Sequence, residues 1–477
     1  MSAGLPGFAV IGTVGPAARQ AADRVRAALA AAGIRLPSRK ILASLAPADV
    51  PTTGARFDLA LAAAVLVRLG VVPAEAAERC AFLGELALDG AVRAVSAVLP
   101  STARLRDAGV RRLFVSDANA SEAELVEGVE VVGVATLSEM IRVCAGEAPR
   151  SVEHIPPPPV CRPRAELADV RGQAEARRAI EIAAAGGHHV LLLGPPGCGK
   201  SMLATRLPAL LPPLDDSQAL ELTAVRSVAG LLSGTAVLAL DRTPPLRAPH
   251  HVTTAAALLG GGTGVALPGE ISLATHGVLF LDELFEWPRR LLDALREPLE
   301  QGCVRIARAR ATVTYPAVFQ LVCAANPCPC GGAGQCECSD AEVWAYRRRL
   351  SGPLADRIDL APRLTPLAAD DLVGTAAGES TATVAARVTR ARAMAVGRWG
   401  VVNGRAAPAS TRATAGHQAL RTLGRAVEAG ALSGRGFDRA LRVARTCADL
   451  EGRESIAREH VLEALMHRSA LRDARHG

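Results

Sequence analysis

The sequence predicts an α/β protein with several domains, and three patterns support that prediction. A strand-like run at residues 189–193 leads into a glycine-rich turn and a helix-compatible segment. A second buried-strand signal, at residues 278–281, ends in two acids, and this alternation is typical of a parallel α/β domain. From about residue 366 onward, apolar residues recur at helical spacing. The clearest of these helical stretches are residues 384–396, 436–450 and 456–468.

Local signals divide the 477 residues into regions, and the length suffices for two to four domains of about 150 residues each. The first region combines predicted helices at 16–32 and 57–69 with strand-like runs at 40–45, 112–115 and 129–134, which indicates a mixed α/β domain. Four consecutive prolines, 156–159, indicate an extended linker. The predicted order is a mixed α/β domain at 1–145, a proline-rich linker at 146–165, the parallel α/β domain at 166–365 and a helical domain at 366–477.

Hydropathy and cysteine content bear on the compartment. The longest apolar run, residues 59–67, ends at Arg68 and is shorter than the roughly 20 residues that cross a bilayer. The first 22 residues lack a basic segment followed by an apolar stretch, so we expect no secretory signal. Eleven cysteines, an odd number, fit reduced thiols rather than a disulfide framework. We therefore expect a cytoplasmic protein with no membrane partner.

The positive charge is concentrated near the C-terminus. The net charge is +7, and residues 366–477 hold 17 basic against 11 acidic groups. Between Glu379 and Glu428 there are eight arginines and no acid, which makes this stretch a candidate for binding nucleic-acid phosphates. Solvated arginine-rich helices are the alternative. The arginines expected to neutralise phosphates are Arg387, Arg390, Arg392, Arg398, Arg405 and Arg412.

The glycine-rich turn matches an eight-residue phosphate-binding loop between a strand and a helix. Its backbone N–H groups would cradle phosphate oxygens, Lys200 would reach the β and γ phosphates of ATP, and Ser201 would bind Mg²⁺. Lys200 and Lys40 are the two lysines among 54 basic residues, and retention of Lys200 fits a compact point charge. The predicted ATP-binding residues of this loop are Gly194, Pro195, Pro196, Gly197, Cys198, Gly199, Lys200 and Ser201.

The second buried strand supplies two adjacent carboxylates with different predicted roles. Asp282 would hold Mg²⁺ together with Ser201, and Glu283 would act as the general base that polarises the attacking water. A strand followed by two such acids, downstream of a phosphate-binding loop, predicts ATP hydrolysis rather than ATP binding alone.

Further segments resemble those of AAA+ ATPases. Residues 321–326, ending in Asn326, look like the sensor-1 strand, and residues 351–359 look like the arginine-finger segment. The resemblance implies that Asn326 orients the lytic water and that Arg357 reaches the nucleotide of a neighbouring subunit in a ring, usually a homo-hexamer. Arg435 matches sensor 2 on the helical lid, and Gln173 ends a segment that resembles the one near the adenine.

More specific sequences resemble the magnesium-chelatase-like AAA+ group, and above all the ComM/YifB family. They are residues 247–251, 268–274, 295–300 and 326–331, with residues 4–8, 45–49 and 82–90 matching its N-terminal domain. The resemblance implies that this N-terminal domain has the fold of the Lon peptidase domain, and that the protein moves along or branch-migrates single-stranded or branched DNA during natural transformation and recombination.

The N-terminal domain departs from the family in two places. The chain begins almost at Gly4, so we expect the domain to be incomplete at its start, and residues 52–56 replace the usual glycine-serine turn. A Lon-like protease needs a serine nucleophile activated by a lysine. Lys200 is assigned to the phosphates, so Lys40 is the one lysine left that could activate a serine. We therefore expect the N-terminal domain to be a binding or assembly module with no peptidase activity.

Four cysteines form a separate candidate metal site. Cys328, Cys330, Cys336 and Cys338 fall within eleven residues, and glycines between them would let the loop fold back around Zn²⁺. Because C-x-C is tighter than the usual spacing, an exposed loop of reduced cysteines is an equal alternative. His250 and His251 have no spaced partner nearby, so we expect them to line the surface or core of the domain.

Two other functions remain open on the sequence. The chain could be the motor subunit of a metal chelatase, although the family resemblance gives such subunits no N-terminal domain of this kind. It could also be a nucleotide-gated assembly scaffold, although Glu283 and Arg357 would then have no purpose. The predicted function is a Mg²⁺-dependent AAA+ ATPase that forms a ring and acts on DNA.

Overall fold

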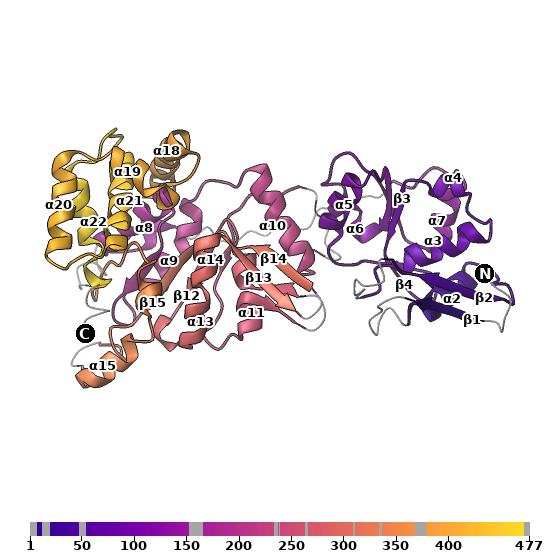
Figure 1. Cartoon of the computed structure of the whole chain (residues 1–477), viewed down its shortest axis with the longest axis horizontal. Coiled ribbons are helices and arrows are strands. Elements are labelled where there is room, and N and C mark those ends of the chain that lie inside the picture. Colours follow the sequence, from indigo (N-terminus) through magenta and orange to yellow (C-terminus); the bar gives the residue numbers. More distant parts are fainter. Residues whose placement is uncertain are drawn as a thin grey trace.

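The computed structural model of the chain is elongated, with the N-terminal region at one end and a group of helices at the other (Figure 1). It describes residues 7–11, 20–46, 54–151, 166–232, 237, 239–262, 266–308, 311–332, 336–367 and 378–471. The proline-rich linker falls largely at 152–165, outside the described residues, as do most of residues 45–53.

The N-terminal region contains small sheets covered by helices. Strands β3 (Cys80–Leu83), β6 (Arg112–Ser116) and β7 (Glu130–Val134) form one parallel sheet, and β1 (Gly7–Ile11) pairs in parallel with β2 (Lys40–Ser44). A short antiparallel pair joins β4 (Glu85–Leu86) to β5 (Val92–Arg93). The helices are α2 (Ala21–Ala31), α3 (Asp58–Arg68), α4 (Ala74–Ala77), α5 (Val98–Asp107), α6 (Asp117–Ala123) and α7 (Leu137–Cys144).

This region has its own apolar core, and one buried ion pair joins two of its helices. Leu59, Leu66 and Phe114 are fully buried in that core. Asp58, at the start of α3, accepts hydrogen bonds from Arg24 Nε at 2.6 Å and from the backbone N–H of Leu86 at 3.3 Å. Because the buried carboxylate is paired and hydrogen-bonded, α3 is fixed against α2 and β4.

The central region is built on a parallel sheet with the order β8-β15-β12-β9. Its strands are β8 (Val190–Leu193), β15 (Gln320–Ala325), β12 (Val278–Leu281) and β9 (Leu246–Arg247). Strands β12 and β15 are buried at every position, as expected of parallel strands covered on both faces. The sheet order places β15 between the strand that leads to the phosphate-binding loop and the strand that ends in two acids.

Helices and two antiparallel strand pairs surround this sheet, and one of these pairs joins β10 (Gly260–Gly261) to β11 (Leu267–Pro268). The helices are α8 (Ala174–Gly186), α9 (Lys200–Leu210), α10 (Asp216–Val228), α11 (Ala255–Leu259), α12 (Glu270–Leu273), α13 (Arg289–Ala294), α14 (Arg296–Gln301), α15 (Asp340–Arg347) and α16 (Gly352–Ala355). An antiparallel hairpin, β13 (Cys303–Arg308) and β14 (Ala311–Pro316), precedes β15. The N-terminal region meets the central one where Ser227 of α10 accepts a backbone hydrogen bond from Ala97, at 3.0 Å.

The C-terminal helices share a hydrophobic core with the central sheet. They are α18 (Thr381–Trp399), α19 (Pro408–Ala413), α20 (His417–Glu428), α21 (Gly434–Leu450) and α22 (Arg458–Met466). One cluster joins Val190 and Leu203 of the central region to Val388 and Leu441 of α18 and α21. These helices are therefore packed onto α8 and α9 rather than around a core of their own.

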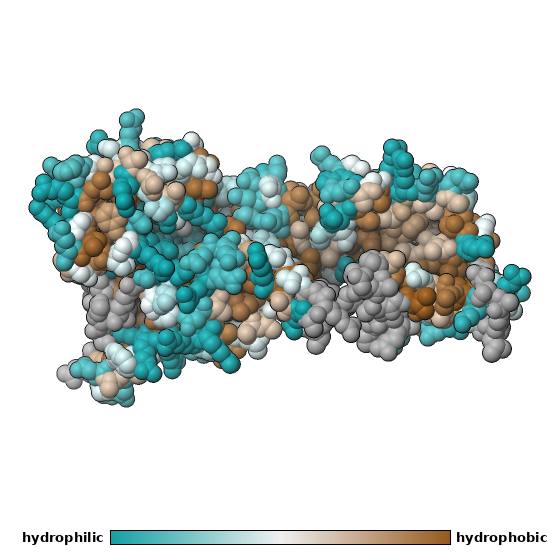
Figure 2. Space-filling model, viewed as in Figure 1, coloured by the Kyte–Doolittle hydropathy of each residue, from teal (hydrophilic) through white to brown (hydrophobic). Residues whose placement is uncertain are grey.

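The predicted fold class is confirmed, because parallel sheets and a helical C-terminal region are both present. In Figure 2 the face in view is mostly hydrophilic over the central and C-terminal regions, while hydrophobic surface gathers over the N-terminal region near α2. Among the helices within the described residues, none is long and apolar enough to cross a membrane.

Candidate active site

The phosphate-binding loop connects β8 to α9, and it holds the Lys200 ammonium inside the protein. Lys200 Nζ donates to the carbonyl oxygens of Gly194 at 2.7 Å and Pro195 at 2.8 Å, and its side chain is almost fully buried. Gly197 and Gly199 adopt left-handed backbone, with φ of 76° and 92°, which favours glycine at both positions. A Cβ at either glycine would meet no atom within 4 Å, so this part of the loop is open.

Burial lowers the pKa of Lys200 from its ordinary value, and the nearby Cys198 and Asp282 oppose that shift. The loop thus places a desolvated cation at the N-terminus of the eleven-residue helix α9, whose free N–H groups and dipole favour an anion. An open loop, a buried cation and a helix N-terminus together fit the polyphosphate of a nucleotide.

The two carboxylates after β12 occupy distinct positions. Asp282 Oδ2 accepts a hydrogen bond from Ser201 Oγ at 2.8 Å, which joins the two predicted Mg²⁺ ligands. The backbone N–H of Glu283 donates to Asp282 Oδ1 at 2.9 Å, and Glu283 has a left-handed backbone with φ of 50°. A non-glycine residue in this region carries strain, and such strain concentrates at functional sites. The side chain of Glu283 is half exposed.

His251 contacts Glu283, the predicted general base. This contact was not predicted from the sequence. Its Nδ1 lies 3.0 Å from Glu283 Oε2, and its ring lies against that of His250 with centroids 4.1 Å apart. His251 follows β9, and β9 pairs in parallel with β12, the strand that ends before Glu283. The neighbouring strands bring the two side chains together, and the expectation that His251 lines the domain did not include this contact.

Asn326 reaches the phosphate-binding loop because β15 lies next to β8. Its Oδ1 accepts a hydrogen bond from Lys200 Nζ at 3.0 Å. The pairing of β15 with β8 on one side and β12 on the other brings Asn326 between the lysine and the carboxylates. Gln173 lies beside the same loop, where its Nε2 donates to the carbonyl oxygens of Cys198 at 3.3 Å and Thr365 at 2.6 Å.

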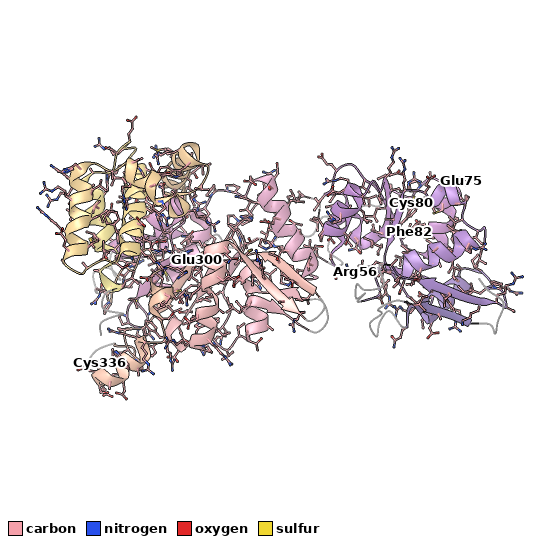
Figure 3. All side chains as sticks on the ribbon, viewed as in Figure 1. Arg56, Glu75, Cys80, Phe82, Glu300 and Cys336 are labelled. Carbon is pink, nitrogen blue, oxygen red and sulfur yellow. The ribbon has the colours of Figure 1, made fainter. Side chains whose placement is uncertain are left out.

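Arg357 and Arg435 lie apart from this constellation. Arg357 is buried, pairs with Glu300, and donates through Nη1 to the carbonyl oxygen of Pro353 at 2.6 Å. Burial lowers its pKa, and so do the positive charges of Arg296, Arg439 and Arg435. Glu300, labelled in Figure 3, belongs to the central region and is partly exposed. Arg435 is near enough to lower the pKa of Arg357, and neither arginine is a hydrogen-bond partner of Lys200 among the described residues.

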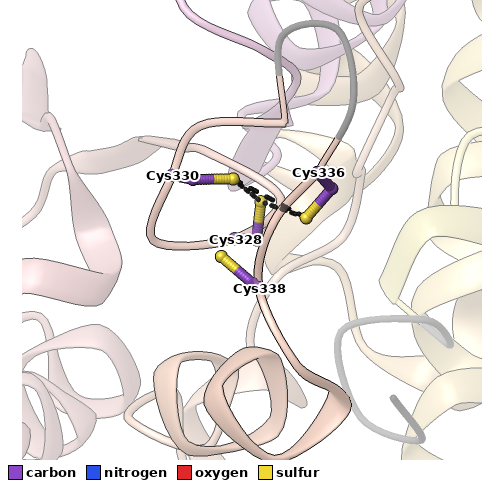
Figure 4. Close-up of side chains that lie close together, drawn as sticks. All are labelled: Cys328, Cys330, Cys336 and Cys338. Carbon is purple, nitrogen blue, oxygen red and sulfur yellow. Dashed lines mark hydrogen bonds between the residues drawn. The ribbon is translucent and has the colours of Figure 1, made fainter.

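The four cysteine sulfurs converge on one point, as Figure 4 shows. Cys328 Sγ lies 3.3 Å from Cys330 Sγ and 3.5 Å from Cys336 Sγ, and all four sulfurs lie within 4.8 Å of one another. The N–H of Gly332 and the neighbouring thiols lower the pKa of Cys330 to about 6. Burial raises the pKa of Cys328 to about 12.

The arginine-rich stretch is less available for DNA than its composition suggests. Arg387 of α18 pairs with Glu181 at 2.5 Å and Glu379 at 2.6 Å, and hydrogen bonds to these partners raise its pKa. Arg398 holds the buried Asp449 at 2.7 Å. Both arginine side chains are partly exposed but already paired with carboxylates, which makes them less available to phosphates; their role as phosphate contacts stays a prediction.

The other arginines of this stretch differ in exposure. Arg392 donates to the carbonyl oxygen of Ala184 at 2.7 Å, and burial lowers its pKa to about 10. Arg412 pairs loosely with Asp438 at 3.5 Å. Arg390 is exposed, and Arg405 is exposed as a residue although burial of its guanidinium lowers its pKa.

Comparison with known proteins identifies the family. The model for magnesium chelatase, subunit ChlI, matches residues 166–372, the model for subunit ChlI of Mg-chelatase matches residues 1–119, and that for its C-terminal part matches residues 378–468. The chain belongs to the magnesium-chelatase-like AAA+ family. This confirms the resemblance noted in the sequence.

Full-length relatives agree with this assignment. The chain is 45% identical over 481 residues to an uncharacterized protein of Mycobacterium tuberculosis, covering 98% of this chain and 94% of that protein. It is 40% identical to the uncharacterized protein YifB of Escherichia coli, covering 98% and 93%, and 39% identical to the competence protein ComM of Haemophilus influenzae, covering 99% and 94%. The family relationship therefore extends over nearly the whole chain.

Proposed function

We propose that the chain is a Mg²⁺-dependent ATPase that works as a ring on single-stranded or branched DNA. The observation that carries the ATPase part is the meeting of five side chains, two from the start of α9 and three from the ends of β12 and β15. Lys200 contacts Asn326, Ser201 contacts Asp282, and Glu283 follows directly. These groups suit binding of a polyphosphate and hydrolysis of its terminal phosphate.

Each side chain has a defined task in this proposal. Lys200 and the backbone N–H groups of residues 194–201 bind the phosphates, while Gln173 holds the loop against Thr365 near the base. Ser201 and Asp282 would hold Mg²⁺, which supplies charge neutralisation of the phosphates. Glu283 accepts the proton of the attacking water, Asn326 orients that water, and His251 positions the Glu283 carboxylate.

The site requires groups from a second copy of the chain. Lys200 bonds to Gly194, Pro195 and Asn326, whereas Arg357 is held by Glu300 and Pro353 and feels the charge of Arg435. We therefore infer that both act on the nucleotide of a neighbouring subunit, where added positive charge stabilises the transition state. Head-to-tail contacts of this kind close into a ring, and a homo-hexamer is the expected size.

The DNA part of the proposal rests on the family and on exposed basic residues. The Haemophilus influenzae relative is named a competence protein, so we carry over a role in natural transformation and recombination. Arg305 and Arg308 lie exposed on the β13–β14 hairpin, and Arg390 and Arg405 are exposed in the C-terminal region. These four are our candidate phosphate contacts. A role on DNA also fits a cytoplasmic location.

The proposed function is tested by the ATPase rate of the full chain with and without single-stranded or forked DNA. We expect Mg²⁺-dependent hydrolysis that DNA stimulates. Hydrolysis without DNA binding or stimulation would contradict the DNA part and favour a chelatase motor. Ring assembly on ATP without turnover would contradict the ATPase part and favour a scaffold.

We also propose that Cys328, Cys330, Cys336 and Cys338 bind one Zn²⁺ ion. The convergence of four sulfurs supports this over an open loop of reduced cysteines.

A further inference from the structure

The loop that carries the cysteines is in direct contact with the nucleotide site at two points. Cys328 follows Asn326 by two residues, so the loop leaves β15 at the residue that contacts Lys200. Gly331 lies against Pro196 of the phosphate-binding loop, where a Cβ would come within 2.8 Å of Pro196 Cγ. Gly331 has φ of 89°, so both conformation and space require glycine there. The two loops also border a shared pocket of about 260 Å³, lined in part by Gly194, Pro327 and Gly332.

The sulfur spacing is that of a metal site. Tetrahedral zinc with Zn–S bonds of about 2.3 Å separates neighbouring sulfurs by roughly 3.8 Å. The closest sulfur pairs here, 3.3, 3.5 and 3.6 Å apart, lie near that value. A disulfide brings its sulfurs to about 2.05 Å. The side chains therefore converge at the separation that suits four thiolates around one ion.

The loop has little else to hold its shape. Within the described part of residues 327–339 there is no helix or strand. Its start is tied by Arg347, whose Nε donates to the carbonyl oxygen of Pro327 at 3.0 Å. A turn from Cys328 to Gly331 contributes one backbone hydrogen bond of 3.0 Å. After Cys338, Ser339 caps helix α15. The N–H of Gly332 also bonds to the Cys330 sulfur, and the N–H of Cys330 to the Cys338 sulfur. Four metal–sulfur bonds would thus add to the order of the segment between β15 and α15.

We propose that a Zn²⁺ ion held by Cys328, Cys330, Cys336 and Cys338 braces the nucleotide site. The ion fixes the turn after β15, and through that turn it holds the Asn326 amide toward Lys200 and Gly331 against Pro196. Loss of the metal releases both contacts and loosens the phosphate-binding loop. The catalytic consequence rests on the proposed ATPase function, but metal content and nucleotide affinity do not depend on turnover.

The metal is tested first, by elemental analysis of the full chain purified under reducing conditions. We expect about one zinc per chain. The double variant Cys328→Ser/Cys330→Ser should lose it, because hydroxyls do not replace thiolates as zinc ligands. Cys80→Ser is the matched control, since Cys80 lies in the N-terminal region at the opposite end of the molecule from Cys336 (Figure 3). Zinc-free wild-type protein, or a disulfide among the four cysteines, would overturn the proposal.

The effect of the ion on the nucleotide site is tested by removing zinc from unmodified protein with a zinc-selective chelator while Mg²⁺ stays in excess. This avoids a variant that fails to fold. We expect affinity for a non-hydrolysable ATP analogue to fall about tenfold or more, and to return when zinc is restored. Unchanged affinity for the ATP analogue after complete zinc removal would overturn the proposal that the ion stabilises the nucleotide site. If nucleotide binding depends on zinc but the protein has no ATPase activity, the proposed role of the ion holds and the proposed ATPase function fails.

A third variant tests whether the ion affects nucleotide binding through the contact between Gly331 and Pro196. Gly331→Ala keeps all four sulfurs but drives a methyl group into Pro196. We expect zinc content to stay at about one per chain while nucleotide affinity falls. Wild-type nucleotide affinity in this variant would overturn the contact through which the ion acts.

Discussion

Two positively charged regions of the chain use their charge in opposite ways. The phosphate-binding loop has a single lysine, and its ammonium is held next to Asn326 in an open loop. Helix α18 carries several arginines, yet Arg387, Arg392 and Arg398 point into contacts with α8, α21 and nearby acids. The density of charge in a sequence therefore does not locate a binding surface, whereas the spacing of a motif between a strand and a helix does.

The physical reason is the way in which the C-terminal helices pack. Helix α18 shares a core with α8 and α21, so arginines beside its apolar stripe face neighbouring helices. Glu181 and Asp449 are buried at these contacts, and a buried carboxylate requires a partner. Arg387 and Arg398 meet that requirement, and this explains part of the basic stretch by internal ion pairing.

The largest expected effect tests the single lysine. Lys200→Ala should abolish ATP binding, because it removes the one ammonium that faces the phosphates. Glu283→Gln should still bind ATP while turnover stalls, since it removes only the base. Lys40→Ala is the matched control and should behave as wild type, because Lys40 is exposed on β2. Binding of a fluorescent ATP analogue together with phosphate release measures all three, and wild-type turnover of the Gln variant would remove Glu283 from its role.

The geometry of the candidate ATP-binding residues was predictable because their order along the chain sets it. A strand, a glycine-rich turn and a helix N-terminus bring Gly194 through Ser201 together without distant contacts, and Asp282 and Glu283 end a strand of the same sheet. The proposed role of Asn326 came from the family resemblance, since its contact with Lys200 depends on the sheet order.

Other features depend on tertiary contacts that local patterns do not encode. His251 follows a two-residue strand, β9, so the sequence offers little sign that it neighbours Glu283. Glu181, the partner of Arg387, lies 206 residues from it in the sequence. Asp449, the partner of Arg398, lies 51 residues from it. Periodicity identified α18 as a helix, but it could not reveal which neighbours those arginines face.

The next effect concerns Arg357, which we propose acts on the nucleotide of a neighbouring subunit. Arg357→Ala should leave ATP binding nearly intact and lower turnover by about 10³-fold or more, because the finger stabilises the transition state from a neighbouring subunit. Mixing Arg357→Ala with Glu283→Gln protein should restore some turnover, since composite interfaces then contain one intact site. The mixture is measured by ATP hydrolysis after subunit exchange. Full activity of Arg357→Ala alone would show that the finger lies elsewhere.

A smaller effect is expected at His251. His251→Ala should lower kcat about tenfold and leave the affinity for ATP unchanged, because His251 orients the base and does not contact the phosphates. His250→Ala is the control on the adjacent ring. Steady-state kinetics separates the two parameters, and an unchanged kcat would exclude a positioning role for His251.

Helix α18 itself can be tested by its stability. Arg387→Gln should destabilise the fold by about 1–3 kcal/mol, because the buried Glu181 loses a charged hydrogen bond. Arg390→Gln, on the exposed face of the same helix, should change the free energy of unfolding by less than about 0.5 kcal/mol. Urea denaturation compares them. Equal stability of the two variants would mean that Arg387 is as free as Arg390.

The smallest and most specific effect is on the salt dependence of DNA binding. Each phosphate contact contributes about 0.7 to 0.9 to the slope of log K against log salt, because neutralising a phosphate releases condensed counterions. Arg305→Gln/Arg308→Gln on the β13–β14 hairpin should shallow this slope by about 1 to 2 units, and Arg390→Gln/Arg405→Gln compares the exposed arginines of the C-terminal region. Arg387→Gln should leave the slope unchanged, since its guanidinium is already paired with Glu181 and Glu379. Fluorescence anisotropy with single-stranded and forked DNA at several salt concentrations measures each slope. A shallower slope for Arg387→Gln in a folded protein would return helix α18 to the DNA interface, and it would mean that its internal ion pairs open when DNA binds.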